Sequence, residues 1–131
     1  MVKFGYTILY VTNVTNSIQF YENCFGFNRM FITPDNSYGE LETGQTSIAF
    51  ASLDMANQNL KNGCLQSDLT NKPFAIELAF VTNDVEVIVN RAKQFGATIV
   101  EEPKTKPWGQ TVAYVRDIDG FLIEICSPII E

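Results

Sequence analysis

The chain has 131 residues, of which 46% are hydrophobic and 18% charged, a composition typical of a single globular domain and not of a disordered segment. Its net charge is −6, it contains no histidine, and its lysines and arginines form no cluster. These features argue against a nucleic-acid partner and favour a cationic ligand.

Three features of the sequence predict a cytoplasmic location. The cysteines, Cys24, Cys64 and Cys126, are odd in number and widely spaced, which argues against a disulfide framework and against a structural zinc site. The N-terminal residues lack an apolar signal region. No apolar run approaches the roughly 18 residues of a membrane span, so we expect no membrane partner.

The first half of the chain predicts one strand, one helix and three more strands. Asn13 is suited to cap the start of the helix, and Gly26 follows its last apolar residue, where a left-handed C-cap is expected. The expected elements are a strand at 4–11, a helix at 13–25 and strands at 27–33, 37–43 and 45–52.

A polar segment, residues 53–72, then predicts a linker with a short helix over Leu53–Lys61. After it the order of elements repeats, with Asp84 as the expected helix cap and Gly96 at the helix end. The expected elements are a strand at 74–82, a helix from Asp84 to Gly96 and strands at 97–103, 110–116 and 121–126.

The two halves also match in their residues. Tyr10-Val11-Thr12-Asn13-Val14 corresponds to Phe80-Val81-Thr82-Asn83-Asp84-Val85, and Phe25-Gly26 corresponds to Phe95-Gly96. We therefore expect an α+β fold in which two βαβββ repeats, residues 1–52 and 73–131, form paired curved sheets around a cleft within one domain.

Two glutamates interrupt apolar strands in the second repeat. Strand alternation places the bulky side chains Phe74, Ile76, Leu78 and Phe80 under the helix, so Glu77 lies on the opposite face between two alanines. In the last strand, Glu124 shares a face with Leu122 and Cys126. A carboxylate in an apolar run is costly unless it is paired, bound to a metal or solvated, so both are candidate site residues.

The segment Pro107-Trp108-Gly109-Gln110-Thr111-Val112-Ala113-Tyr114-Val115-Arg116-Asp117-Ile118-Asp119-Gly120-Phe121-Leu122-Ile123-Glu124 resembles the closing motif of the vicinal oxygen chelate superfamily. The segment Tyr6 to Asn13, with Ser17-Ile18-Gln19-Phe20-Tyr21-Glu22 and Phe25-Gly26-Phe27, is similar to its opening signature. This superfamily includes glyoxalase I, bleomycin-resistance proteins, fosfomycin-resistance enzymes and extradiol dioxygenases.

The resemblance also implies four metal-ligand positions, one in the first and one in the last strand of each repeat. Here they hold Tyr6, a residue around Ile48 or Ala49, Glu77 and Glu124. Two carboxylates and a phenol without any imidazole make a poor site for zinc, nickel or iron. We therefore expect no metal cofactor, the alternative being a weakly bound divalent metal such as magnesium.

Two functions follow from these features. The first is a metal-free, small-molecule-binding protein like those of the bleomycin-resistance branch. It would hold a cationic or aromatic compound against the two glutamates and a set of aromatic side chains. The residues expected at this site are Glu77, Glu124, Tyr6, Tyr10, Phe50, Trp108 and Tyr114. The alternative is a divergent glyoxalase-like lyase or isomerase with Glu124, or else Glu77, as general base. The exposed edges of the sheets need to be covered, and relatives cover them by dimerising, so we expect a homodimer.

Overall fold

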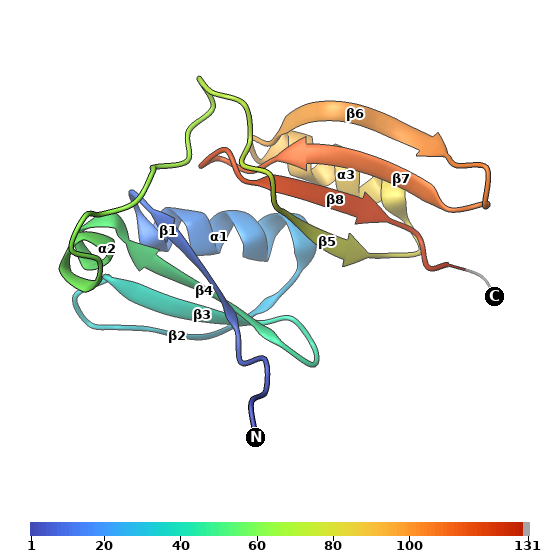
Figure 1. Cartoon of the computed structure of the whole chain (residues 1–131). Coiled ribbons are helices and arrows are strands. Elements are labelled where there is room, and N and C mark those ends of the chain that lie inside the picture. The colour runs from blue at the N-terminus through green and yellow to red at the C-terminus, as the bar shows by residue number, and fades with distance from the viewer. Residues whose placement is uncertain (130–131) are drawn as a thin grey trace. The chain divides into compact units, whose positions relative to one another are not determined.

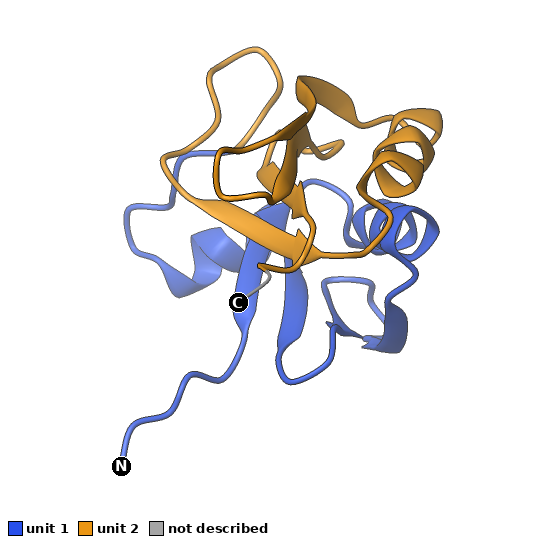
Figure 2. Ribbon diagram, turned by 90° about the vertical axis from the view of Figure 1, so that its right-hand side faces the viewer, with its two compact units in different colours: residues 1–66 blue, residues 67–131 orange. Residues whose placement is uncertain are grey.

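The structure is a computed structural model, and it describes residues 1–129. The chain divides into two compact units, unit 1 (Met1–Gln66) and unit 2 (Ser67–Glu131), coloured blue and orange in Figure 2. The boundary falls inside the segment that the sequence predicts as a linker. The first part of that segment, including its short helix, therefore belongs to unit 1.

Unit 1 is one sheet with a helix packed on one side (Figure 1). Its sheet has the strand order β1-β4-β3-β2; β1 runs parallel to β4, and the other neighbours are antiparallel. Its elements are β1 (Thr7–Val11), α1 (Val14–Phe25), β2 (Asn28–Ile32), β3 (Tyr38–Glu42), β4 (Ser47–Ser52) and α2 (Leu53–Asn59).

Unit 2 repeats this arrangement with the order β5-β8-β7-β6, in which β5 and β8 are parallel. Its elements are β5 (Glu77–Val81), α3 (Val85–Gln94), β6 (Thr98–Thr105), β7 (Thr111–Arg116) and β8 (Leu122–Cys126). The predicted α+β fold of two βαβββ repeats is confirmed, and every predicted strand and helix is present with ends shifted by a few residues. The cleft between the sheets stays a prediction.

Each sheet buries the face that is covered by its helix. In unit 1 the Tyr21 ring of α1 lies 4.9 Å from the Phe50 ring of β4, edge to face, and both side chains are fully buried. In unit 2, α3 packs on β7 and β8, where Val115, Ile123 and Ile125 are fully buried. We call the opposite side of each sheet, which faces away from α1 or α3, its outer face.

The ends of the helices test the predicted caps. Asn13 caps α1, because its Oδ1 accepts a hydrogen bond from Asn16 N at 3.0 Å, and Gly26 ends the helix at a φ of 71°. Asp84 occupies the predicted N-cap position of α3, but its side chain makes no capping hydrogen bond. Its own backbone N–H donates to Thr82 Oγ1 at 3.2 Å, which holds the residue in the turn.

One core prediction in unit 2 is wrong. The sequence places Ile76 under α3, but β5 begins only at Glu77 and Ile76 is 67% exposed. The backbone before Glu77 is not part of the sheet, so strand alternation does not set the direction of that side chain.

Candidate functional site

The outer face of unit 2 brings the two candidate glutamates together. In the sheet register, Glu124 of β8 lies between Ala79 of β5 and Tyr114 of β7. Glu77 lies two residues before Ala79 in β5 and therefore shares this face. The predicted common face of Glu77 and Glu124 is thus present within one sheet.

Three groups converge on the Glu124 carboxylate, which is half-buried. Tyr114 Oη donates a hydrogen bond to Glu124 Oε1 at 3.1 Å. Glu77 is the second group, since the hydrogen bond and negative charge of Glu124 contribute to raising its pKa. The third group is the Cys126 thiol, which lies on the same strand face and donates to Phe80 O at 3.7 Å, while Glu124 contributes to raising its pKa. We call these four residues the acidic cluster.

The electrostatics of the acidic cluster separate the roles of its two carboxyl groups. Partial desolvation against the sheet, followed by the hydrogen bond and the negative charge of Glu124, raises the pKa of Glu77, even though most of the Glu77 side chain is exposed. The Glu77 carboxyl group therefore holds a proton more tightly than an ordinary glutamate does. Glu124 is an acceptor fixed from several sides. The sequence favours Glu124 as the better general base, whereas this geometry favours Glu77 as the group that gains and loses a proton.

Sequence reasoning missed Cys126 as part of this cluster. Burial, together with the hydrogen bond and charge of Glu124, raises the pKa of the Cys126 thiol to about 11. The thiol is therefore protonated at neutral pH and acts as a hydrogen-bond donor, not as a nucleophile. The signal was present in the sequence, since Cys126 follows Glu124 at the spacing of one strand face.

The turn before β8 determines where Glu124 lies. Arg116 is buried and donates to three backbone carbonyls: Gly120 O at 2.9 Å, Asn71 O at 2.7 Å and Asp68 O at 2.8 Å. Asp117 Oδ1 accepts bonds from two backbone N–H groups of the same turn, both at 2.9 Å. The Arg-Asp part of the family motif is therefore structural, because it ties the segment before β5 to the turn that begins β8.

The corresponding strand of unit 1 lacks a carboxylate. Ala49 pairs with Ile8 of β1 and with Glu40 of β3, as Glu124 pairs with Ala79 and Tyr114, so Ala49 occupies the place of Glu124. Glu40 was missed by sequence reasoning. Its carboxylate lies on the outer face of unit 1, next to Ala49, and Tyr38 Oη donates to its Oε2 at 2.6 Å.

The predicted ligand-binding aromatics fall into different environments. Phe50 is contradicted as a ligand contact, because it has no exposed surface and packs against α1 in the core. Trp108 lies in the turn between β6 and β7 and is 62% exposed, with Nε1 donating to Gln110 Oε1 at 2.8 Å. Tyr114 belongs to the acidic cluster. Tyr10 lies in β1 at the alternation of the outer face of unit 1, whereas Tyr6 precedes β1 and is 52% exposed.

The residues do not fit a catalytic transition metal. In the part of the chain that the structure describes, no three histidine, cysteine or acidic side chains are grouped so that they could hold a metal ion. The chain has no histidine, and the acidic cluster offers two carboxyl groups. Catalytic sites for such metals use about three protein ligands with an open position, a set that these residues do not supply.

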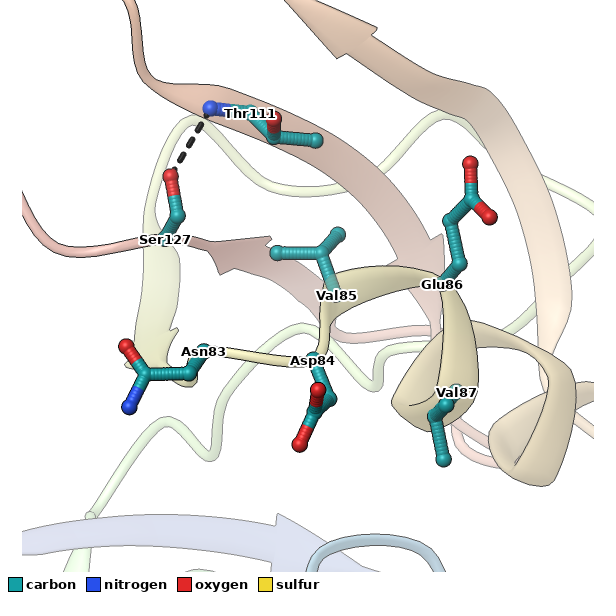
Figure 3. Close-up of a pocket in the computed structure, with 7 residues that line it drawn as sticks. All are labelled: Asn83, Asp84, Val85, Glu86, Val87, Thr111 and Ser127. Atoms are coloured by element: carbon teal, nitrogen blue, oxygen red, sulfur yellow. Dashed lines mark hydrogen bonds between the residues drawn. The ribbon is translucent and has the colours of Figure 1, made fainter.

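A pocket of about 340 Å³ lies elsewhere in unit 2, at the start of α3 (Figure 3). Its lining residues are Asn83, Asp84, Val85, Glu86, Val87, Thr111 and Ser127. Thr111 N donates to Ser127 Oγ at 2.9 Å on one side of it, and the side chains of Asp84 and Val87 point away from that bond in Figure 3. Neither glutamate of the acidic cluster lines this pocket.

Two βαβββ units, with a glutamate in the last strand of the second, define a protein of the vicinal oxygen chelate superfamily. A family model described as a glyoxalase-like domain matches residues 4–130, and the chain belongs to that family. No curated protein matches the chain. No helix among residues 1–129 is both long enough and apolar enough to cross a bilayer.

Solved structures show the same fold at low sequence identity. A glyoxalase/bleomycin resistance protein/dioxygenase family enzyme from Burkholderia phytofirmans has a TM-score of 0.82 and 19% identity, covering 96% of this chain and 98% of that one. A glyoxalase-related enzyme from Fulvimarina pelagi has a TM-score of 0.82 and 18% identity, with coverages of 98% and 89%. Lactoylglutathione lyase from Agrobacterium tumefaciens has a TM-score of 0.70 and 17% identity, with coverages of 97% and 94%.

Proposed function

We propose that this chain is a small-molecule-binding protein that holds an organic cation at the acidic cluster of unit 2 without a catalytic metal. The observation that carries the proposal is the pair of carboxyl groups on one sheet face, Glu77 and Glu124, with Tyr114 Oη donating to Glu124 from the neighbouring strand. The charge of Glu124 contributes to raising the pKa of Glu77, and a cation that donates N–H bonds can compensate that charge in place of a proton.

The chemistry of the cluster favours a protonated amine over other ligands. A bound ammonium group favours the ionised form of Glu77, because its positive charge compensates two carboxylates that otherwise repel each other. The net charge of −6 attracts cations and repels phosphates and carboxylates. The exposure of Glu77 keeps the pair accessible from solvent.

A lyase or isomerase is the second candidate, and the raised pKa of Glu77 favours it. A carboxyl group with a raised pKa is better suited than an ordinary one to move a proton to and from a substrate carbon or oxygen. In that case Glu77 is the acid–base group, and Glu124 and Tyr114 position it. One of the structural neighbours, the Agrobacterium tumefaciens protein, is a lactoylglutathione lyase.

A titration with butylammonium tests the binding proposal. We expect binding to release protons at a pH below the raised pKa of Glu77 and none well above it, measured by calorimetry in two buffers of different ionisation enthalpy. Glu124→Gln and Glu77→Gln each lower the affinity roughly tenfold, because a charge-assisted bond of about 1.5–3 kcal/mol is lost. Glu101→Gln is the matched control, because this exposed glutamate lies opposite Tyr114 in the register.

Binding without proton release below the raised pKa of Glu77, or equal affinities of all three variants, contradicts the proposal. Turnover of the methylglyoxal–glutathione hemithioacetal by metal-stripped protein, lost in Glu77→Gln, favours the enzyme instead.

Titration with bleomycin, followed by Trp108 fluorescence, tests whether a large cationic drug is bound. Sedimentation at micromolar concentration tests the homodimer, which we propose from the exposed edges of both sheets.

A further inference from the structure

The turn that follows α2 (Figure 1) contains the one place in the sequence where glycine follows asparagine, Asn62-Gly63. Asn62 is exposed, and no hydrogen bond within residues 1–129 involves its side chain. Gly63 has a φ of +66°. Because glycine has no Cβ, nothing on this residue shields its backbone nitrogen from the asparagine side chain before it. The Asn62 carboxamide can therefore reach the Gly63 nitrogen.

A single backbone hydrogen bond holds the Gly63 nitrogen. Gly63 N donates to Leu60 O at 3.0 Å, and Leu60 is the C-cap of α2. The acceptor is a neutral carbonyl at the end of a helix of 7 residues, in an exposed segment. Bonds at exposed helix ends open more readily than those inside a sheet. Opening this bond therefore exposes the Gly63 nitrogen without unfolding unit 1.

Other asparagines in turns are held by carboxylates. The backbone nitrogen that follows Asn36 belongs to Ser37 and donates to Asp35 Oδ1 at 3.1 Å. A negatively charged acceptor strengthens such a bond and disfavours loss of the N–H proton. The Asn71 side chain donates to Asp68 Oδ1 at 3.1 Å. The turn after α2 contains no acidic residue that could act in this way.

Glycine also follows an acidic residue in the turn before β8, at Asp119-Gly120, but the backbone there is locked. Gly120 is buried, and its N–H donates to Asp117 O at 3.1 Å. Its carbonyl accepts a bond from Arg116 Nε at 2.9 Å. A glycine is therefore not sufficient for reactivity, and the exposure and the unbonded side chain distinguish Asn62.

We propose that Asn62 is a site of spontaneous covalent modification, at which the carboxamide becomes a carboxylate through a cyclic imide. The Gly63 nitrogen gives its proton to solvent base and attacks Cγ of Asn62. The N–Cγ bond forms, the Cγ–Nδ2 bond breaks, and the side-chain nitrogen leaves as ammonia. Water then opens the imide at either carbonyl carbon, which gives aspartate or isoaspartate. The reaction consumes water and needs neither an enzyme nor an oxidant.

The modification changes both the charge and the backbone of the turn. Either product adds a negative charge just beyond the C-terminal end of α2, where the helix dipole disfavours it. Isoaspartate also adds one methylene group to the main chain, so Gly63 N no longer fits its bond to Leu60 O. Leu60 N donates to Ala56 O at 2.8 Å, and we expect this last bond of α2 to loosen. The proposal stands independently of the proposed function of unit 2.

The full chain, aged at mildly alkaline pH and body temperature, is the material for the test. Peptide mass spectrometry follows the peptide that contains Asn62, which should gain about 1 Da per event, or about 3 Da in water enriched in oxygen-18. We expect the rate at Asn62 to exceed those at Asn36 and Asn71 by roughly tenfold or more. Hydrogen exchange of the Leu60 amide should be faster in the isoaspartate form than in the unmodified chain.

Two variants make the result specific. Gly63→Ala should slow the reaction by roughly fivefold or more, because a Cβ crowds the attacking nitrogen. Gly44→Ala is the matched control, since it places alanine at another positive φ in unit 1, and it should leave the rate at Asn62 unchanged. An absent mass gain at Asn62, equal rates at Asn36, or an unchanged rate in Gly63→Ala each overturns the proposal. Unaltered exchange of the Leu60 amide in the isoaspartate form would overturn the inferred loosening of α2.

Discussion

The same row across the two sheets carries different chemistry in the two units. In unit 1 the row from the first strand to the edge is Ile8, Ala49, Glu40 and Phe31; in unit 2 it is Ala79, Glu124, Tyr114 and Glu101. Even the irregularity of the edge pair is repeated, with register shifts between Arg29 and Phe31 and between Ile99 and Glu101. One backbone plan therefore holds two different arrays of side chains.

Each unit has a phenol that donates to a carboxylate, but the strands that supply them differ. In unit 1 both come from β3, as Tyr38 and Glu40. In unit 2 the phenol comes from β7 and the carboxylate from β8, as Tyr114 and Glu124. The difference shows that family membership fixes the strand positions available to a site, while the residues at those positions decide which ligand it suits.

The largest effect that we predict is a difference in stability between two glycine substitutions, one in the turn before the last strand of each unit. A Cβ at Gly120 would lie 2.7 Å from backbone atoms of Asp68, at a φ of +94°. Gly120→Ala should therefore destabilise the protein by about 3 kcal/mol or more. Gly44→Ala, at a φ of +117° with no atom near the new methyl group, should cost only about 1 kcal/mol. Urea unfolding measures both, and equal costs would contradict the tight contact at Gly120.

A carboxylate introduced into unit 1 at the position that corresponds to Glu124 tests the difference between the two units. Ala49 has no exposed surface, so Ala49→Glu places a charge where it has little access to solvent, and we expect a loss of about 3 kcal/mol. The reverse change, Glu124→Ala, should cost about 1 kcal/mol, because the half-buried Tyr114 hydroxyl loses its acceptor but can reach water. If Ala49→Glu were as stable as the native chain, burial would not explain why unit 1 lacks this carboxylate.

The raised pKa of Glu77 gives a smaller effect on stability that depends on pH. The pKa of Glu77 is raised in the folded state, so its contribution to stability is complete below the ordinary glutamate pKa of about 4.3 and is lost as the pH rises through the raised value. Glu77→Gln cannot titrate. Its free energy of unfolding should match that of the native chain at about pH 4 and exceed it by about 0.5 kcal/mol at pH 7, since exposed pairs are screened.

The control for this prediction is Glu101→Gln, whose stability relative to the native chain should change little between the same pH values. A native chain that gains stability relative to Glu77→Gln as the pH rises would reverse the expected sign. Such a result would mean that Glu77 is not the protonated partner.

The smallest effect concerns the thiols. With its pKa at about 11, Cys126 should react with iodoacetamide at pH 8 at least tenfold more slowly than exposed Cys64. Glu124→Gln removes the negative charge next to the thiol and should narrow this difference. Mass spectrometry of labelled peptides measures both rates. Equal rates for Cys126 and Cys64 in the native chain would contradict the placement of the thiol beside Glu124.

The sequence predicted the elements and their order because the apolar spacing and the caps act locally. Asn13 and Gly26 are examples of such local signals, since each needs only its own helix. Strand faces were harder to predict. The residues of β4 are small or apolar on both sides, so alternation could not tell that Phe50 faces α1 while Ala49 lies on the outer face.

The site was predicted only as far as single strands could show it. Glu77 and Glu124 were identified because each interrupts an apolar strand. Glu40 was not identified, since β3 reads as polar and its partner Tyr38 becomes apparent only from the hydrogen bond. Which carboxyl group carries the proton depends on distances between strands, and local sequence patterns do not contain them.

The central claim, that the neighbouring Glu124 helps to raise the pKa of Glu77, is tested most directly by a carbon-13 NMR titration of the side-chain carboxyl groups. We predict that the Glu77 carbon titrates above the ordinary glutamate pKa in the native chain and that its pKa falls toward the ordinary value in Glu124→Gln, without reaching it because the desolvation remains. A Glu77 carbon that titrates at the ordinary value in both proteins would contradict it.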